Sequence, residues 1–159
     1  MRDLLRLLLR SMGVKTVHEA ENGAMALKLL KERAIDIAIC DLLMAEVDGN
    51  AFTREVRQSA AGSQRYLPII MVTGHSERKV IESARDAGVT EFLRKPITAR
   101  SLYLRLVEVV ERPRPFIQCA TYFGPDRRRK KCDDPSVYGS RRAEDRGEAS
   151  EIVFLAEDA

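Results

Sequence analysis

Two hydrophobic periods alternate along the first 112 residues of the chain. Apolar positions three or four residues apart are typical of amphipathic helices, and compact apolar or β-branched runs are typical of strands. The helical spacing predicts helices over residues 1–12, 22–33, 50–60, 76–88 and 98–112. The compact runs predict strands over residues 14–20, 35–40, 66–73 and 90–95. The runs "IDIAIC" and "YLPIIMVT" are almost wholly apolar, as expected of strands buried on both faces of a parallel sheet.

Regular alternation of helix and strand with short connections predicts βαβ units, and hence an α/β fold with a doubly wound parallel sheet between helices. The pattern ends at Pro113, so we predict one domain over 1–112 and a tail over 113–159. The tail is rich in proline and charge and lacks apolar periodicity, which indicates a poorly ordered extension. Its last residues, "EIVFLAED" (151–158), are again apolar and strand-like.

Composition narrows the classes of protein that fit. Apolar residues make up 45% of the 159 residues, which excludes wholesale disorder, and the net charge of +3 is too small for a whole-chain nucleic-acid binder. Three scattered cysteines indicate neither a disulfide framework nor a zinc site, so a reducing cytoplasm is the expected location. No apolar run approaches the roughly 18 residues that span a bilayer, so no membrane association is predicted.

Three polar residues fall at or just past the ends of different predicted strands: Asp41, Thr73 and Lys95. Parallel sheets place ligand sites at the carboxyl ends of their strands, so we expect these side chains at one edge. A carboxylate can attack a phosphoryl group, a lysine supplies positive charge, and a hydroxyl can bond a phosphoryl oxygen. Phosphoryl transfer needs mainly such positioning, usually with Mg²⁺. No glycine-rich nucleotide-binding motif occurs, which disfavours a nucleotide enzyme.

These residues resemble the receiver domain of bacterial two-component response regulators, of the CheY-like type. The resemblance covers residues 1–112 and rests on "CDLLMAEVDG", "IIMVTGH" and "FLRKPIT", in that order. It implies a flavodoxin-like sheet of 2-1-3-4-5 order. It also implies the following roles: Asp41 as phosphoacceptor, Thr73 and Phe92 as switch residues, Lys95 as the phosphoryl contact, Asp41 and the backbone carbonyl of Leu43 as Mg²⁺ ligands, and a cis peptide bond before Pro96.

The sequence departs from the family pattern in two places. Met44-Ala45 stands where receivers usually have Met-Pro. More importantly, the family's first strand and its metal-binding acidic pair should lie just before Met1, so we expect the first strand of the sheet to be missing from residues 1–112. We weigh three explanations: a start within a longer receiver, a degenerate receiver that does not bind metal, or a replacement by residues 151–158. The third would bring Glu157 and Asp158 to the metal site.

The resemblance implies a single-domain response regulator, a signalling protein and not an enzyme. A sensor histidine kinase or phosphotransfer protein would phosphorylate Asp41, and a surface that includes residues 76–111 would bind a downstream protein target. The alternative is a non-phosphorylated adaptor that keeps the receiver surface. A remote alternative is contact with nucleic acid through the basic run Arg127–Lys131, which has acidic neighbours and no helix-turn-helix pattern beside it.

Overall fold

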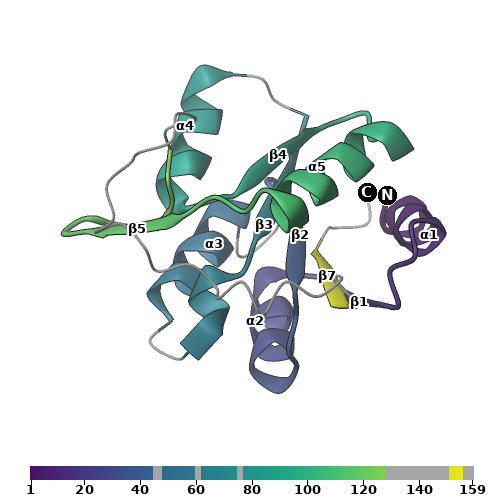
Figure 1. Ribbon diagram of the computed structural model, residues 1–159, viewed down its shortest axis with the longest axis horizontal. Coiled ribbons are helices and arrows are strands. Elements are labelled where there is room, and N and C mark those ends of the chain that lie inside the picture. Colours follow the sequence, from purple (N-terminus) through teal and green to yellow (C-terminus); the bar gives the residue numbers. More distant parts are fainter. Residues whose placement is uncertain (45–47, 60–61, 75–76, 128–150, 156–159) are drawn as a thin grey trace.

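A computed structural model describes residues 1–44, 48–59, 62–74, 77–127 and 151–155 (Figure 1). Its helices are α1 (Arg2–Ser11), α2 (Gly23–Glu32), α3 (Gly49–Gln58), α4 (Arg78–Ala87), α5 (Ala99–Glu111) and the 3₁₀ helix η1 (Gly62–Tyr66). Its strands are β1 (Thr16–Ala20), β2 (Ile37–Asp41), β3 (Ile69–Thr73), β4 (Glu91–Arg94), β5 (Phe116–Cys119), β6 (Tyr122–Pro125) and β7 (Glu151–Leu155). The predicted alternation over 1–112 is therefore confirmed, and η1 is an element that periodicity did not predict. Among the described helices, none is long and apolar enough to cross a membrane.

Helix ends follow local sequence signals. The side chain of Asn22 accepts a hydrogen bond from the backbone at the start of α2, and that of Asp48 does the same for α3. Thr98 forms a capping box with Ser101 at the start of α5. Gly88 closes α4 with φ +100°, a left-handed conformation that costs glycine little.

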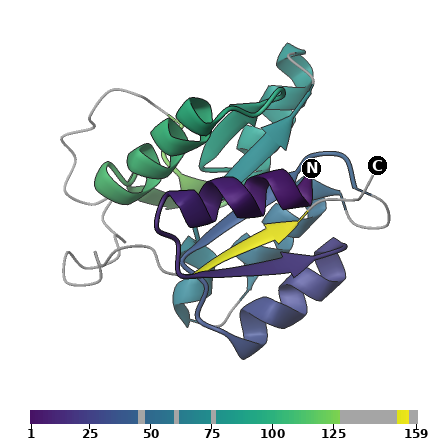
Figure 2. The same cartoon turned by 90° about the vertical axis from the view of Figure 1, so that its right-hand side faces the viewer.

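The sheet has five parallel strands in the order β1-β7-β2-β3-β4. Figure 2 shows β7, in yellow, lying between β1 and the remaining strands. In this register Ile152 pairs with Val17 on one side and with Ile37 on the other. A strand from the far end of the chain thus fills the position where the sequence lacks a first strand, which confirms the replacement for residues 151–155. Glu157 and Asp158 lie outside the described residues.

Helices cover both faces of the sheet (Figure 2). One core packs α1 and α5 against the sheet, and the other packs α2, α3 and α4 against the opposite face. Ile152 belongs to the first core and Val153 to the second, and both side chains are 0% exposed. Asp36 fixes the start of β7, because its backbone N–H donates to Glu151 O and its carboxylate accepts from Glu151 N. β7 therefore contributes to both cores as a central strand does.

The prediction of a poorly ordered tail is wrong for the start of that segment. Residues Phe116–Cys119 and Tyr122–Pro125 form an antiparallel hairpin, β5–β6. The rings of Phe116 and Phe123 meet the ring of Tyr66 at centroid distances of 5.2 and 5.3 Å. Two four-residue strands are too short to give a clear period, and their stability comes from aromatic contacts with η1, which lies more than 50 residues earlier.

Candidate functional site

The carboxyl ends of the sheet strands bring the three predicted polar residues to one edge. Asp41 ends β2 and is 6% exposed, and Thr73 ends the neighbouring strand β3 and is also buried. Asp41 pairs with Val72, the residue before Thr73, and Thr73 pairs with Arg94, the residue before Lys95. This arrangement follows directly from parallel pairing, as the sequence predicted.

Asp41 and Lys95 form an ion pair at the centre of this edge. The Lys95 Nζ donates to Asp41 Oδ2 at 2.6 Å, and the Leu43 backbone N–H donates to Asp41 Oδ1 at 3.2 Å. The lysine side chain is 37% exposed and the aspartate side chain 8% exposed, so the cation lies on the solvent side of the carboxylate. The Lys95 backbone N–H donates to Thr73 O at 2.9 Å, and the predicted cis peptide bond joins Lys95 to Pro96.

Close packing beneath Asp41 depends on Gly49, the first residue of α3. A Cβ at this position would lie 2.7 Å from Asp41 O and 2.8 Å from Met71 Sδ, so only glycine fits without a shift. The preceding residue, Asp48, caps the helix that begins at Gly49. Cys40 is a buried core residue, and burial together with the charge of Asp41 raises the pKa of its thiol. The thiol is therefore protonated and unreactive near neutral pH.

The other predicted site residues lie close to this edge. Phe92 on β4 pairs with Met71 and is half-buried against the core that faces α2, α3 and α4. Leu43, two residues beyond Asp41, is 63% exposed, so the backbone beside it is near solvent. Within the described ranges no group of three or more acidic, histidine or cysteine side chains could hold a metal ion.

The donors that are described fit Mg²⁺ only in part. Mg²⁺ prefers six oxygen ligands, of which one or two are carboxylates and several are water. Asp41 and the Leu43 carbonyl are two suitable oxygen donors beside solvent. The predicted carboxylates of Glu157 and Asp158 follow β7, whose last described residue, Leu155, pairs with Cys40, next to Asp41.

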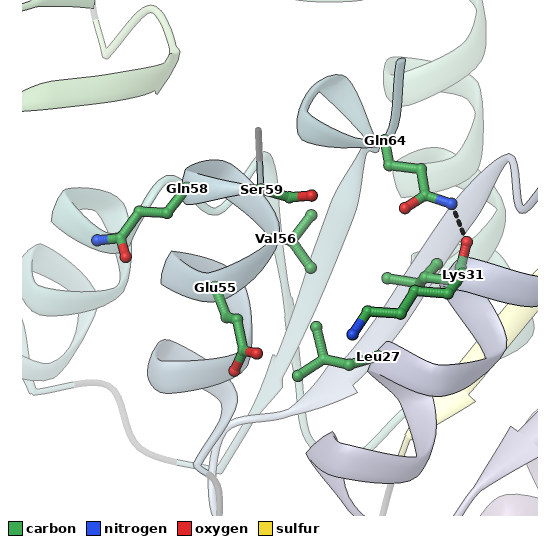
Figure 3. Close-up of a pocket in the computed structure, with 8 residues that line it drawn as sticks. Leu27, Lys31, Glu55, Val56, Gln58, Ser59 and Gln64 are labelled. Carbon is green, nitrogen blue, oxygen red and sulfur yellow. Dashed lines mark hydrogen bonds between the residues drawn. The ribbon is translucent and has the colours of Figure 1, made fainter. Parts of the chain in front are cut away.

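A separate pocket lies between α2 and α3 (Figure 3). It has a volume of about 260 Å³ and is lined by both apolar and polar side chains, among them Leu27, Lys31 and Glu55. The side-chain amide of Gln64 bridges its rim by donating to Leu30 O. Neither Asp41, Thr73 nor Lys95 lines it, so it is distinct from the strand-end site.

Fold and site together define a class: a doubly wound parallel sheet with a lysine-paired carboxylate at the carboxyl edge. Comparison with known proteins identifies a family with this fold. Residues 1–107 match the response regulator receiver domain family. The chemotaxis protein CheY-3 of Vibrio cholerae is 33% identical over 112 residues, covering 70% of this chain and 85% of CheY-3. CheY of Pseudomonas aeruginosa is 34% identical over 112 residues, covering 70% of this chain and 89% of CheY.

Solved structures give the same result. Vibrio cholerae CheY4 superposes with a TM-score of 0.62 at 28% identity, covering 68% of this chain and 88% of CheY4. The receiver domain of the Pseudomonas aeruginosa sensor histidine kinase PA1611, a structure with magnesium coordinated in its active-site cleft, has a TM-score of 0.59 at 27% identity. That match covers 67% of this chain and 84% of that domain. The chain belongs to the response regulator receiver family. The matched residues 1–107 end before the β5–β6 hairpin and before β7.

Proposed function

We propose that this receiver accepts a phosphoryl group on Asp41 and signals through a protein surface. The observation that carries the proposal is the 2.6 Å contact between Lys95 Nζ and the buried Asp41 carboxylate. In this contact the Lys95 ammonium lies on the solvent side of the Asp41 carboxylate. A phosphoryl group that reached the carboxylate from solvent would therefore meet a positive charge.

The proposed donor is a phosphohistidine of a sensor histidine kinase or phosphotransfer protein. A carboxylate oxygen of Asp41 forms a bond to phosphorus while the bond between phosphorus and the histidine nitrogen breaks, and that nitrogen retains the electron pair. Lys95 then pairs with the added negative charge, and the Thr73 hydroxyl donates a hydrogen bond to a phosphoryl oxygen. No base is required, because the attacking oxygen carries no proton.

Mg²⁺ would reduce the repulsion between the carboxylate and the incoming phosphoryl group. We propose Asp41 and the Leu43 carbonyl as two of its ligands. Glu157 and Asp158 are the proposed carboxylates in place of the family's acidic pair, because the strand that precedes them lies beside β2. Calorimetry of Mg²⁺ binding to the unphosphorylated chain tests these ligands. Asp158→Ala should weaken the affinity at least tenfold, because loss of a ligand typically costs more than about 1.4 kcal/mol of binding free energy.

The phosphoryl charge would act on two neighbouring elements. Thr73 leads into α4, and Phe92 is half-buried on β4, so displacement of Thr73 toward the phosphoryl group would shift both. We propose that α4, β4 and α5 form the surface that a downstream protein target recognises. A cytoplasmic location fits a partner of this kind.

Acetyl phosphate tests the phosphoacceptor assignment without knowledge of the kinase. The intact chain is incubated with acetyl phosphate and Mg²⁺ and then weighed by mass spectrometry. We expect one phosphoryl adduct, labile to hydroxylamine as an acyl phosphate is, and none in Asp41→Asn. No adduct in a chain whose circular dichroism shows it folded would refute the assignment.

The alternative is an adaptor that keeps the receiver surface but is not phosphorylated. The observation in its favour is that the described residues contain no group of three or more acidic, histidine or cysteine side chains that could hold a metal ion. Nucleic-acid contact has less support. Of the basic run, only Arg127 lies within the described residues, and its guanidinium already pairs with Asp86 at 2.8 Å. The acetyl phosphate experiment separates the first two functions.

A further inference from the structure

The β5–β6 hairpin, which lies outside the family match, packs on the part of the receiver that is proposed to move. Figure 1 shows it on the side of the sheet that carries α3 and α4. Its contact with η1 is an aromatic cluster of Tyr66, Phe116 and Phe123, with centroids 5.2 to 5.6 Å apart. The Arg65 guanidinium lies 3.6 Å from the Phe123 ring centroid and adds a cation–π contact.

A buried arginine joins this cluster to the end of α4. Arg57 of α3 is 3% exposed and donates from Nε to Gly88 O at 3.0 Å and from Nη1 to Leu67 O at 2.7 Å. Its guanidinium lies 5.0 Å from the Phe116 ring centroid, so the hairpin covers it. Burial lowers the pKa of Arg57, because the charged form loses hydration. The hairpin and the carboxyl end of α4 therefore share one buried cation.

The backbone of the hairpin also touches the end of α4 directly. A Cβ built on Gly124 of β6 would lie 3.1 Å from Gly88 Cα. The backbone of β6 therefore closely approaches the residue that ends α4. Any shift of the end of α4 by more than a few tenths of an ångström must therefore move β6 or lose this contact.

Two ion pairs tie the hairpin to the segment from α4 to β4. Before β5, Arg114 pairs with Glu91 of β4, a buried carboxylate that also accepts from Arg105 at 3.3 Å. After β6, Arg127 pairs with Asp86 of α4 at 2.8 Å. Both ends of the hairpin are thus fixed to the same stretch of chain, residues 86–91, which runs from the end of α4 to the start of β4.

From this geometry we infer that the β5–β6 hairpin is a latch on the α4–β4 segment, which holds the unphosphorylated arrangement and loosens when Asp41 is phosphorylated. The inference rests on the proposed phosphorylation. The hairpin contacts coexist with the Lys95–Asp41 ion pair, which would have to loosen for Lys95 to reach a phosphoryl group on Asp41. A contact made in only one of two states favours that state, and the coupling is reciprocal. Weakening the latch should therefore raise the phosphorylated fraction of Asp41.

Asp86→Asn in the full chain is the test variant, and Glu82→Gln is its matched control. Glu82 lies one helical turn earlier on α4, where it pairs with the exposed Arg78 and not with the hairpin. Phosphorylated fraction at a fixed, subsaturating acetyl phosphate concentration is measured by mass spectrometry. An ion pair of this exposure is worth up to about 1 kcal/mol, so Asp86→Asn should shift the ratio of phosphorylated to unmodified chain by about two- to fivefold upward. Glu82→Gln should leave it unchanged.

Amide hydrogen exchange of residues 116–125, followed with and without acetyl phosphate and Mg²⁺, gives the second readout. We expect faster exchange on phosphorylation in the natural chain and no change in Asp41→Asn. An adduct on Asp41 with unchanged hairpin exchange would overturn the latch and leave the phosphoacceptor standing. Faster exchange in Asp41→Asn as well would also overturn it, because the reagent and not the phosphoryl group would be responsible. Absence of any adduct would overturn both proposals, and the mass spectrum alone would show it.

Discussion

The placement of β7 at the centre of the sheet makes a quantitative prediction for Ile152. Its side chain is 0% exposed and packs in the core that α1 and α5 cover. Truncation of a fully buried isoleucine to alanine costs about 2–5 kcal/mol, from lost transfer free energy and the cavity left behind. A domain of this size has about 5–15 kcal/mol of stability in total, so Ile152→Ala should remove a large part of the free energy of unfolding.

Val153 extends the prediction to the opposite face of the same strand. Its side chain is also 0% exposed, but it lies in the core that α2, α3 and α4 cover. We expect Val153→Ala to cost about 1–3 kcal/mol, because a fully buried valine is worth about that much. A strand packed on one face only would be sensitive at one of the two positions, so sensitivity at both requires a strand that helices cover on both faces.

Urea denaturation followed by circular dichroism measures both effects. With an m-value of about 2 kcal/mol per M, the loss of about 2–5 kcal/mol in Ile152→Ala should lower the midpoint by about 1–2.5 M. The control is Leu7→Ala on α1, a side chain that is 67% exposed and whose truncation should change stability by no more than about 0.5 kcal/mol. If Ile152→Ala and Leu7→Ala unfolded at the same urea concentration, the placement of β7 between β1 and β2 would be wrong.

Three further predictions concern the site edge and the hairpin. Lys95→Gln should lower the yield of Asp41 acyl phosphate about ten- to hundredfold at fixed acetyl phosphate, since a charge-assisted contact is worth about 1.5–3 kcal/mol; an unchanged yield by mass spectrometry would contradict it. Gly49→Ala should cost about 1–3 kcal/mol in the same urea assay, because its Cβ would lie 2.7 Å from Asp41 O; stabilisation instead would show that α3 can shift freely. Burial raises the pKa of Tyr122 above its ordinary value of 10, so the folded chain keeps that proton where the unfolded chain loses it. The contribution of this group to the free energy of unfolding is therefore present below pH 10 and is lost as the pH rises through the folded-state pKa. Tyr122→Phe should remove this contribution, so its free energy of unfolding should fall less between pH 9 and 11 than that of the natural chain.

Sequence patterns were sufficient for the body of the fold and for the strand-end edge that carries Asp41, Thr73 and Lys95. The runs that end at Asp41 and Thr73 are compact and apolar, so their position in a parallel sheet could be predicted from period and length alone. Once the strands are parallel, their carboxyl ends must meet at one edge, which is why the contact between Asp41 and Lys95 needed no further information. Gly49 is the exception at this edge, because its role depends on a distance to Asp41 that no local pattern contains.

The hairpin and the final strand depended on tertiary structure. Phe116 and Phe123 pack on Tyr66, and this partner lies in a different part of the sequence. The resemblance to the receiver family implied that the family's first strand would lie before Met1, and residues 151–158 had the composition to replace it. The tertiary structure decided that residues 151–155 pair in parallel with both β1 and β2, and thereby place Ile152 in one core and Val153 in the other. The physical reason is that strand pairing is non-local: its hydrogen bonds and buried faces come from segments more than a hundred residues away, so composition alone cannot choose among possible partners.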